Sequence, residues 1–134
     1  MANLLENRNA FLNSNDALVL IKADSPYFTI VEFNKSFRKA CRIEGIDIIG
    51  KSITELQSWN NANEESALSI HDALNQAILS KEAVRLPVVR YDMPHEVGTG
   101  TEPCWWQASY EPILNADGQV EHLFCTIRNI TKEM

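Results

Sequence analysis

The sequence predicts an α+β domain built on an antiparallel sheet. Its last third, residues 104–131, reads as two aromatic-rich extended segments joined by a tight turn. Nearer the other end, two short β-branched and aromatic runs, residues 17–23 and 28–33, also flank a turn. Between these pairs lies one long stretch with helical spacing, residues 64–80. Strands joined by tight turns pair antiparallel, so we expect one sheet with helices packed on it.

The composition restricts the function classes. The 134 residues hold 45% hydrophobic and 22% charged side chains, as single soluble domains do. A formal charge of −6 without a basic stripe argues against nucleic-acid binding, because phosphate contacts need clustered lysine and arginine. No apolar run suits a signal peptide or membrane span, so we expect a cytoplasmic chain without membrane contact. Cys41, Cys104 and Cys125 lack metal-ligand spacing, which predicts reduced, packed thiols and no metal site.

The N-terminal part predicts an amphipathic helix followed by two strands. The helix occupies residues 1–15. Its apolar stripe consists of Leu4, Leu5, Phe11 and Leu12. Residues 17–23 are almost entirely apolar, as a central strand is, and residues 28–33 are its antiparallel partner. The Asp-Ser-Pro sequence between them predicts a turn, because proline fixes φ and aspartate bonds to nearby backbone.

The middle of the chain predicts helices. Asn34 can cap a short helix that runs through Phe37 and Ala40. Residues 51–57 predict a further helical turn or two. The longest helix is expected over residues 64–80. Its inward face is formed by Ala67, His71, Leu74 and Ile78, at spacings of three and four residues.

The remaining segments complete the sheet. Residues 84–91 predict a third strand, and Pro87 assigns it to an edge because proline donates no ladder hydrogen bond. A flexible loop over residues 92–102 leads into the closing hairpin, whose turn contains Asp117-Gly118.

This order of elements resembles the PAS domain family over about residues 16–131. The positions of the family's second strand, first small helix and IGK-like turn are matched by Ile30, Phe33, Asn34, Phe37 and Ile49-Gly50-Lys51. Its last two strands are matched by Pro112, Asp117-Gly118 and Ile130-Thr131. The segments DSPYFTIVEFNKSF and VVRYDMP, followed by a Trp-rich strand, are especially similar to PAS modules of bacterial sensor histidine kinases.

The resemblance implies the fold and the division of the chain. Residues 1–15 would form an N-terminal amphipathic helix, residues 16–131 the PAS domain, and residues 132–134 the start of a linker to an output domain. The domain would be a five-stranded antiparallel sheet with helices on one face and the N-terminal helix on the other. Asn129 departs from the family's usual aspartate, which ties the last strand to the outgoing segment. The GRNCRFLQ-like helix of flavin-binding light sensors is absent, and Cys41 does not replace it.

Alternation along the hairpin assigns a candidate pocket. Trp106 and Tyr110 share one face of the first strand, as Cys125 and Ile127 do on the second. The resemblance implies that this face meets the helices, where PAS ligands bind. The candidate lining is Ile30, Phe37, His71, Leu74, Trp106, Tyr110, Cys125 and Ile127. The alternative is that these side chains simply fill the core, because large aromatic groups occupy the volume that a ligand needs.

No cofactor is identified by the sequence. Haem-binding PAS sensors use a histidine from the long helix, which would be His71. A lone histidine on an apolar face is more often hydrogen-bonded in or beside the core. Haem and flavin are therefore the less favoured options.

The outer face of the hairpin predicts an interface. Trp105 and Phe124 fall on this face, where exposed aromatic side chains mark a contact surface. The stripe of the N-terminal helix can cover them from the same chain or from a second copy. The resemblance implies a homodimer through this helix and the outer sheet face.

The leading hypothesis is a non-catalytic sensory and signal-relay module of a bacterial two-component protein. A small ligand or partner would bias the hairpin, and a C-terminal effector, expected to be a histidine kinase, would receive that bias. A small cone-shaped enzyme of the ketosteroid-isomerase type is an alternative from another class. The inward hairpin positions carry no carboxylate for its general base, which counts against it. A PAS domain that only dimerises, without a ligand, is the other alternative.

Overall fold

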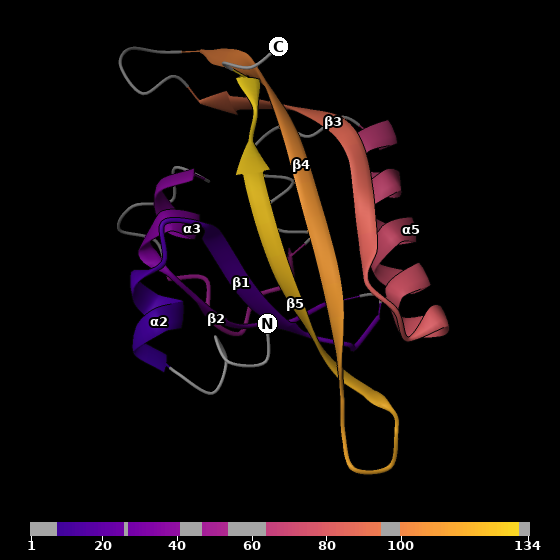
Figure 1. Cartoon of the computed structure of the whole chain (residues 1–134). Helices are drawn as coiled ribbons and strands as arrows, with labels where there is room; N and C mark the ends of the chain where they lie inside the picture. Colours follow the sequence, from indigo (N-terminus) through magenta and orange to yellow (C-terminus); the bar gives the residue numbers. More distant parts are fainter. Residues whose placement is uncertain (1–7, 26, 41–46, 54–63, 95–99, 132–134) are drawn as a thin grey trace.

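The computed structural model describes residues 8–25, 27–40, 47–53, 64–94 and 100–131. Eight elements lie in these ranges (Figure 1). The helices are α2 (Arg8–Asn13), α3 (Lys35–Ala40) and α5 (Glu64–Ser80). The strands are β1 (Ala17–Lys22), β2 (Ile30–Phe33), β3 (Val84–Pro94), β4 (Thr101–Leu114) and β5 (Val120–Asn129).

The strands form one antiparallel sheet in the order β2-β1-β5-β4-β3. The predicted α+β class and the five-stranded antiparallel sheet are therefore confirmed. The first strand of the chain pairs with the last, with Val19 opposite Cys125. The predicted edge position of the Pro87 strand is also confirmed, and the ladder of β3 shifts register between Leu86 and Val89, on either side of that proline.

The loop predicted over residues 92–102 is too long. β3 continues to Pro94 and β4 begins at Thr101, because Met93 and Pro94 still pair with Glu102 and Thr101. An edge strand tolerates proline, so the prolines there did not end the ladder.

The turn of the closing hairpin lies where Asp117-Gly118 predicts it, and it is a five-residue connection rather than a two-residue one. Leu114 pairs with Val120, and residues 115–119 form the loop. The Asn115 side chain organises it: Oδ1 accepts the Asp117 and Gln119 N–H groups at 2.9 and 3.1 Å. Gly118 has φ +78°, a conformation that a side chain would disfavour.

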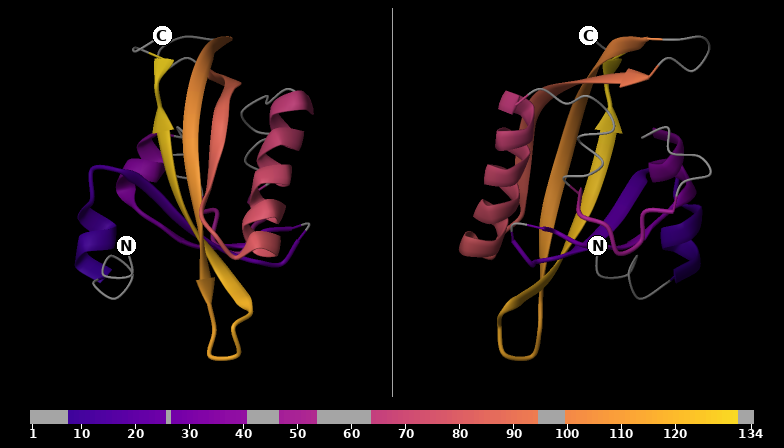
Figure 2. Two further views of the ribbon diagram at one scale, coloured as in Figure 1. Left: turned by 45° about the vertical axis from the view of Figure 1, so that its right-hand side comes forward. Right: turned by 180° about the vertical axis from the view of Figure 1, so that it is seen from behind.

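The sheet divides the apolar side chains into two clusters. The main core lies on the inner face, where α3 and α5 contribute Phe37, Ile70, Leu74 and Ala77. A small second cluster of Phe11, Leu18 and Phe124 lies on the outer face, under α2. Figure 2 shows α5 and α2 separated by the sheet. The face assignment predicted from alternation along the hairpin is confirmed.

Asn34 joins α2, β1 and α3 at one buried point. It caps α3 as predicted, since its Oδ1 accepts the Phe37 N–H at 2.9 Å. The same oxygen accepts the Leu18 N–H at 3.1 Å. Its Nδ2 donates to the carbonyl oxygens of Phe11 and Asp16, at 3.1 and 2.8 Å. With 1% of its surface exposed, Asn34 is the buried polar residue of the described core.

Some predicted features lie outside the described residues. These are Leu4 and Leu5 of the N-terminal stripe, Cys41, most of the helical turns predicted over residues 51–57, and the linker predicted over residues 132–134. Within the described ranges, no helix has the length and apolar character that a bilayer crossing requires.

Candidate functional site

The inner face of the sheet brings the predicted lining residues together. Six of the eight are buried in the main core: Ile30, Phe37, Leu74, Trp106, Tyr110 and Cys125. Ile127 is half-buried and packs against this core. These side chains come from β2, α3, α5, β4 and β5, so one apolar cluster connects most elements of the domain. A change in packing at this cluster therefore reaches all of them.

His71 lies at the edge of the same core. Its ring is half-buried and meets the ring of Phe28 edge to face, at 5.5 Å between centroids and 60° between planes. It lies one turn before Leu74 on α5, as the helical spacing predicts. Among the described residues, no group of three or more metal-binding side chains includes it.

Phe28 is a core residue that the sequence predicts as the start of a strand over residues 28–33, which is wrong at this end because β2 begins at Ile30. Its side chain is fully buried, and its backbone adopts φ +51°, which is uncommon for a bulky residue. Asp24 stabilises this conformation, because its two carboxylate oxygens accept the Thr29 N–H at 2.8 Å and the Thr29 hydroxyl at 2.5 Å. The Asp-Ser-Pro sequence predicted a turn before Phe28 but did not predict the positive φ of this residue.

The Cys125 thiol is buried in the core. Desolvation raises its pKa far above the ordinary value of 9.0. The thiolate is the reactive form of cysteine, so this residue is a packing group and not a nucleophile at neutral pH. Sequence analysis likewise predicts a packed thiol.

We expect this burial to make stability fall at high pH. Above about pH 9 the unfolded thiol ionises while the folded one stays neutral, so the folded state holds one more proton. The free energy of unfolding should then decrease by up to about 1.4 kcal/mol per pH unit from this group. Urea denaturation of the wild type and Cys125→Ala between pH 8 and 10.5 measures it. The variant should show the shallower decline, and equal declines would contradict the assignment.

The end of β5 is tied to β4 at Trp105. The Trp105 N–H donates to Thr131 Oγ1 at 3.0 Å, and the Ile130 N–H donates to the Trp105 carbonyl oxygen at 2.8 Å. Asn129 Oδ1 in turn accepts the Thr131 N–H at 3.0 Å and the Thr131 hydroxyl at 2.5 Å. The amide oxygen of Asn129 thus orders the chain after the last strand, at the position where the family has aspartate.

On the outer face, the same-chain alternative for the cover of the aromatic side chains holds for Phe124. Phe124 is 3% exposed, because Phe11 of the same chain covers it edge to face at 6.1 Å. Trp105 is half-buried and lies under the guanidinium of Arg90, 5.8 Å from the ring centroid. The same chain therefore covers Phe124, while Trp105 lies outside the small outer cluster.

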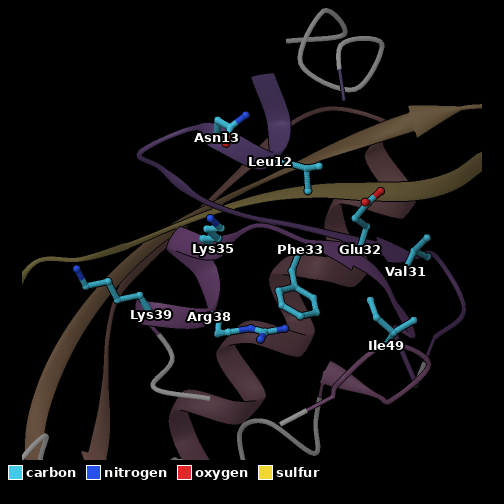
Figure 3. Close-up of a pocket in the computed structure, with 9 residues that line it drawn as sticks. All are labelled: Leu12, Asn13, Val31, Glu32, Phe33, Lys35, Arg38, Lys39 and Ile49. Carbon is cyan, nitrogen blue, oxygen red and sulfur yellow. The ribbon is translucent and has the colours of Figure 1, made fainter. Parts of the chain in front are cut away.

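A groove that the sequence reasoning did not find opens on the surface between α2, β2 and α3 (Figure 3). Its volume is about 910 Å³, and it is partly open to solvent. Its lining consists of Leu12, Asn13, Val31, Glu32, Phe33, Lys35, Arg38, Lys39 and Ile49. None of the eight predicted lining residues belongs to it. The signal in the sequence was the KSFRKA segment, whose basic residues fall on one side of a helix.

The twisted antiparallel sheet, the helices on its inner face and the bonded exit of its last strand define a small α+β domain of the sensory kind. The chain belongs to the PAS family, since the family model described as PAS fold matches residues 11–133. It is a PAS sensory domain.

Solved structures share this fold at low sequence identity. The LOV protein of Rhodobacter sphaeroides has a TM-score of 0.70 and 18% identity, over 97% of this chain and 68% of that chain. A sensory box sensor histidine kinase from Vibrio cholerae has a TM-score of 0.60 and 21% identity, over 97% and 92%. An RNA-binding light-oxygen-voltage receptor has a TM-score of 0.69 and 18% identity, over 99% of this chain and 35% of its own length. The present chain thus spans about a third of that receptor. No protein of curated function matches in sequence.

Proposed function

We propose that this chain is the sensory and signal-relay module of a bacterial two-component protein, without catalysis of its own. A small ligand or partner at the inner face of the sheet shifts the packing of the main core. An effector that follows the domain, expected to be a histidine kinase, receives this shift in the cytoplasm. The likeness to the Vibrio cholerae kinase domain supports this choice of effector.

One observation carries the proposal. The main core and the two residues that follow β5, Ile130 and Thr131 (here called the exit), both contact β4. Trp106 is 3% exposed and belongs to the main core. The adjacent Trp105 binds Ile130 and Thr131 through both of its backbone polar groups. A change in the packing of Trp106 therefore acts on the exit through one peptide unit. Binding shifts this exit only as far as its affinity differs between the two packings.

Native mass spectrometry with an absorption spectrum of the freshly purified chain tests the sensory part. We expect a bound small molecule that raises the native mass and is lost on denaturation. A Soret or flavin band would identify a cofactor. A colourless chain without added mass would favour the ligand-free relay, and catalytic turnover on ketosteroids would favour the enzyme alternative.

The exit hydrogen bonds have a measurable strength. Thr131→Val removes the acceptor of the Trp105 N–H, which should cost about 0.5–1.5 kcal/mol. We expect exchange of the Trp105 and Ile130 amide protons, followed by NMR, to become several-fold faster. Thr126→Val, a matched change on β5, should leave both amides as protected as in the wild type. Equal effects of the two variants would show that Thr131 does not hold the exit.

We also propose that two copies associate through the outer sheet face beside Trp105. Trp105 stays half-buried there after α2 has covered Phe124. Sedimentation of the wild type and Trp105→Ala compares their monomer–dimer equilibria. The variant dimer should dissociate at protein concentrations at which the wild type is still dimeric. A wild type that is monomeric at all concentrations would contradict the proposal.

A further inference from the structure

The groove between α2, β2 and α3 adjoins the inner-face cluster through Phe33, shares none of its eight candidate lining residues and has a distinct chemistry. Its apolar lining comes from three parts of the chain: Leu12 of α2, Phe33 of β2, and Ile49 in the turn before Gly50. Ile49 has 50% of its surface exposed, so apolar area remains open to a partner. Leu12 and Phe33 are half-buried and pack against the outer and the main cluster respectively. Packing against these two clusters holds Leu12 and Phe33 in place, and together with Ile49 they form the apolar floor of the groove.

Three cations from one helix border this floor. Lys35, Arg38 and Lys39 share one side of α3 because they are three and four residues apart. The Arg38 guanidinium lies 5.0 Å from the centroid of the Phe33 ring. Figure 3 shows the Arg38 side chain beside Phe33. A guanidinium held on an aromatic ring loses less freedom on binding an anion than a mobile one does.

The charge of the groove is opposite to that of the molecule. Its three cations and the single carboxylate of Glu32 give a net charge of +2, whereas the chain carries −6. Glu32 already takes part in another contact, so it is not an unpaired charge in the groove. Lys35 and Lys39 are exposed, and neither forms an ion pair within the part of the chain that the structure describes. Positive charge beside apolar surface favours an anionic occupant with apolar side chains.

The shape of the groove favours a peptide over a small molecule. Small-ligand sites enclose most of their ligand, whereas this groove is partly open to solvent. It also runs beside β2, one of the two edge strands of the sheet, so an extended peptide can lie along the side chains of this strand. An extended segment presents its side chains alternately, so apolar and acidic positions can meet the floor and α3 together.

We propose that this groove binds a short acidic segment of a partner protein. The apolar side chains of this segment contact Leu12, Phe33 and Ile49. The carboxylates of the segment face Lys35, Arg38 and Lys39. This site shares no residue with the candidate lining of the inner face, so binding here does not require that core to hold a ligand.

The test is a titration of the full chain against a fluorescein-labelled peptide of alternating leucine and glutamate with one central phenylalanine. Fluorescence anisotropy at low salt should show saturable binding that weakens as salt is added. Arg38→Gln should weaken it by about threefold to fivefold, the loss of one exposed charge pair. Replacing Lys35, Arg38 and Lys39 together by glutamine should weaken it more than tenfold.

Matched controls separate the groove from general charge. Arg85→Gln removes an exposed arginine from β3, at the opposite edge of the sheet, and should leave binding unchanged. Ile49→Ser should weaken binding, whereas Leu68→Ser, at a comparably exposed apolar site on α5, should not. Arg38→Gln could also loosen Phe33, because the two side chains are in contact. Lys35→Gln and Lys39→Gln change only exposed side chains, so each should weaken binding without disturbing the apolar floor.

Three results would overturn the proposal. The first is binding that the triple variant retains. The second is equal binding of a peptide with glutamine in place of glutamate. The third is displacement of the labelled peptide by decanoate at a similar concentration, which would assign the groove to a small amphiphilic acid instead.

Discussion

Asn34→Ala should lower the free energy of unfolding by about 3–5 kcal/mol. The substitution removes the partner of four backbone groups at once, those of Phe11, Asp16, Leu18 and Phe37. A buried polar group left without its partner costs about 1–3 kcal/mol, and losing a helix cap costs about 1 kcal/mol. The effects of neighbouring bonds do not simply add, so the expected total lies below their sum.

Urea denaturation followed by tryptophan fluorescence measures this loss. Asn13→Ala is the matched control, because the Asn13 side chain donates one exposed hydrogen bond to the Asn9 carbonyl oxygen. It should change stability by less than about 0.5 kcal/mol. Asn34→Asp keeps the acceptor and replaces the donor, so it should regain stability at acidic pH, where a protonated carboxyl can donate. A loss no larger for Asn34→Ala than for Asn13→Ala would contradict the role of Asn34.

Phe124→Ala should cost about 3–4 kcal/mol and release α2 from the sheet. The Phe124 ring is 3% exposed and forms the outer cluster with Phe11 and Leu18. Removing a buried phenylalanine loses its transfer free energy and leaves a cavity. Because α2 has only six residues in the described chain, its own hydrogen bonds cannot hold it in place.

A double-mutant cycle separates the contact from the loss of burial. Phe11→Ala, Phe124→Ala and the double variant should show a coupling of about 0.5–1.5 kcal/mol, as edge-to-face aromatic pairs do. Chemical denaturation supplies the four free energies. Additive losses would show that the two rings do not stabilise each other.

Local sequence signals predicted most of the fold. Alternation assigned Trp106 and Phe124 to opposite faces, and Asn34 was recognised as a helix cap. Each of these signals depends on residues close together in the chain. The extra length of β3 and β4 was missed because prolines mark loops in sequence, although an edge strand accepts them.

The features that were missed depend on contacts between distant segments. Nothing beside Asn34 in the sequence shows that its side chain also binds the backbone of Phe11 and Leu18. The groove joins Leu12, Phe33 and Ile49, which the chain brings together only after the sheet has formed. The predicted core residues were found because burial follows periodicity, whereas a surface groove follows none.

The central claim is that the packing of the inner face of β4 sets the order of the exit at Ile130 and Thr131. Amide exchange of Ile130, measured by NMR in Trp106→Phe, tests it most directly. Ile21→Val is the control, since Ile21 is fully buried in the same core on β1. The two variants are compared at urea concentrations that give them the same free energy of unfolding. The account predicts that the Ile130 amide exchanges several-fold faster in Trp106→Phe than in Ile21→Val. Equal exchange in both variants would show that the exit does not respond to the core.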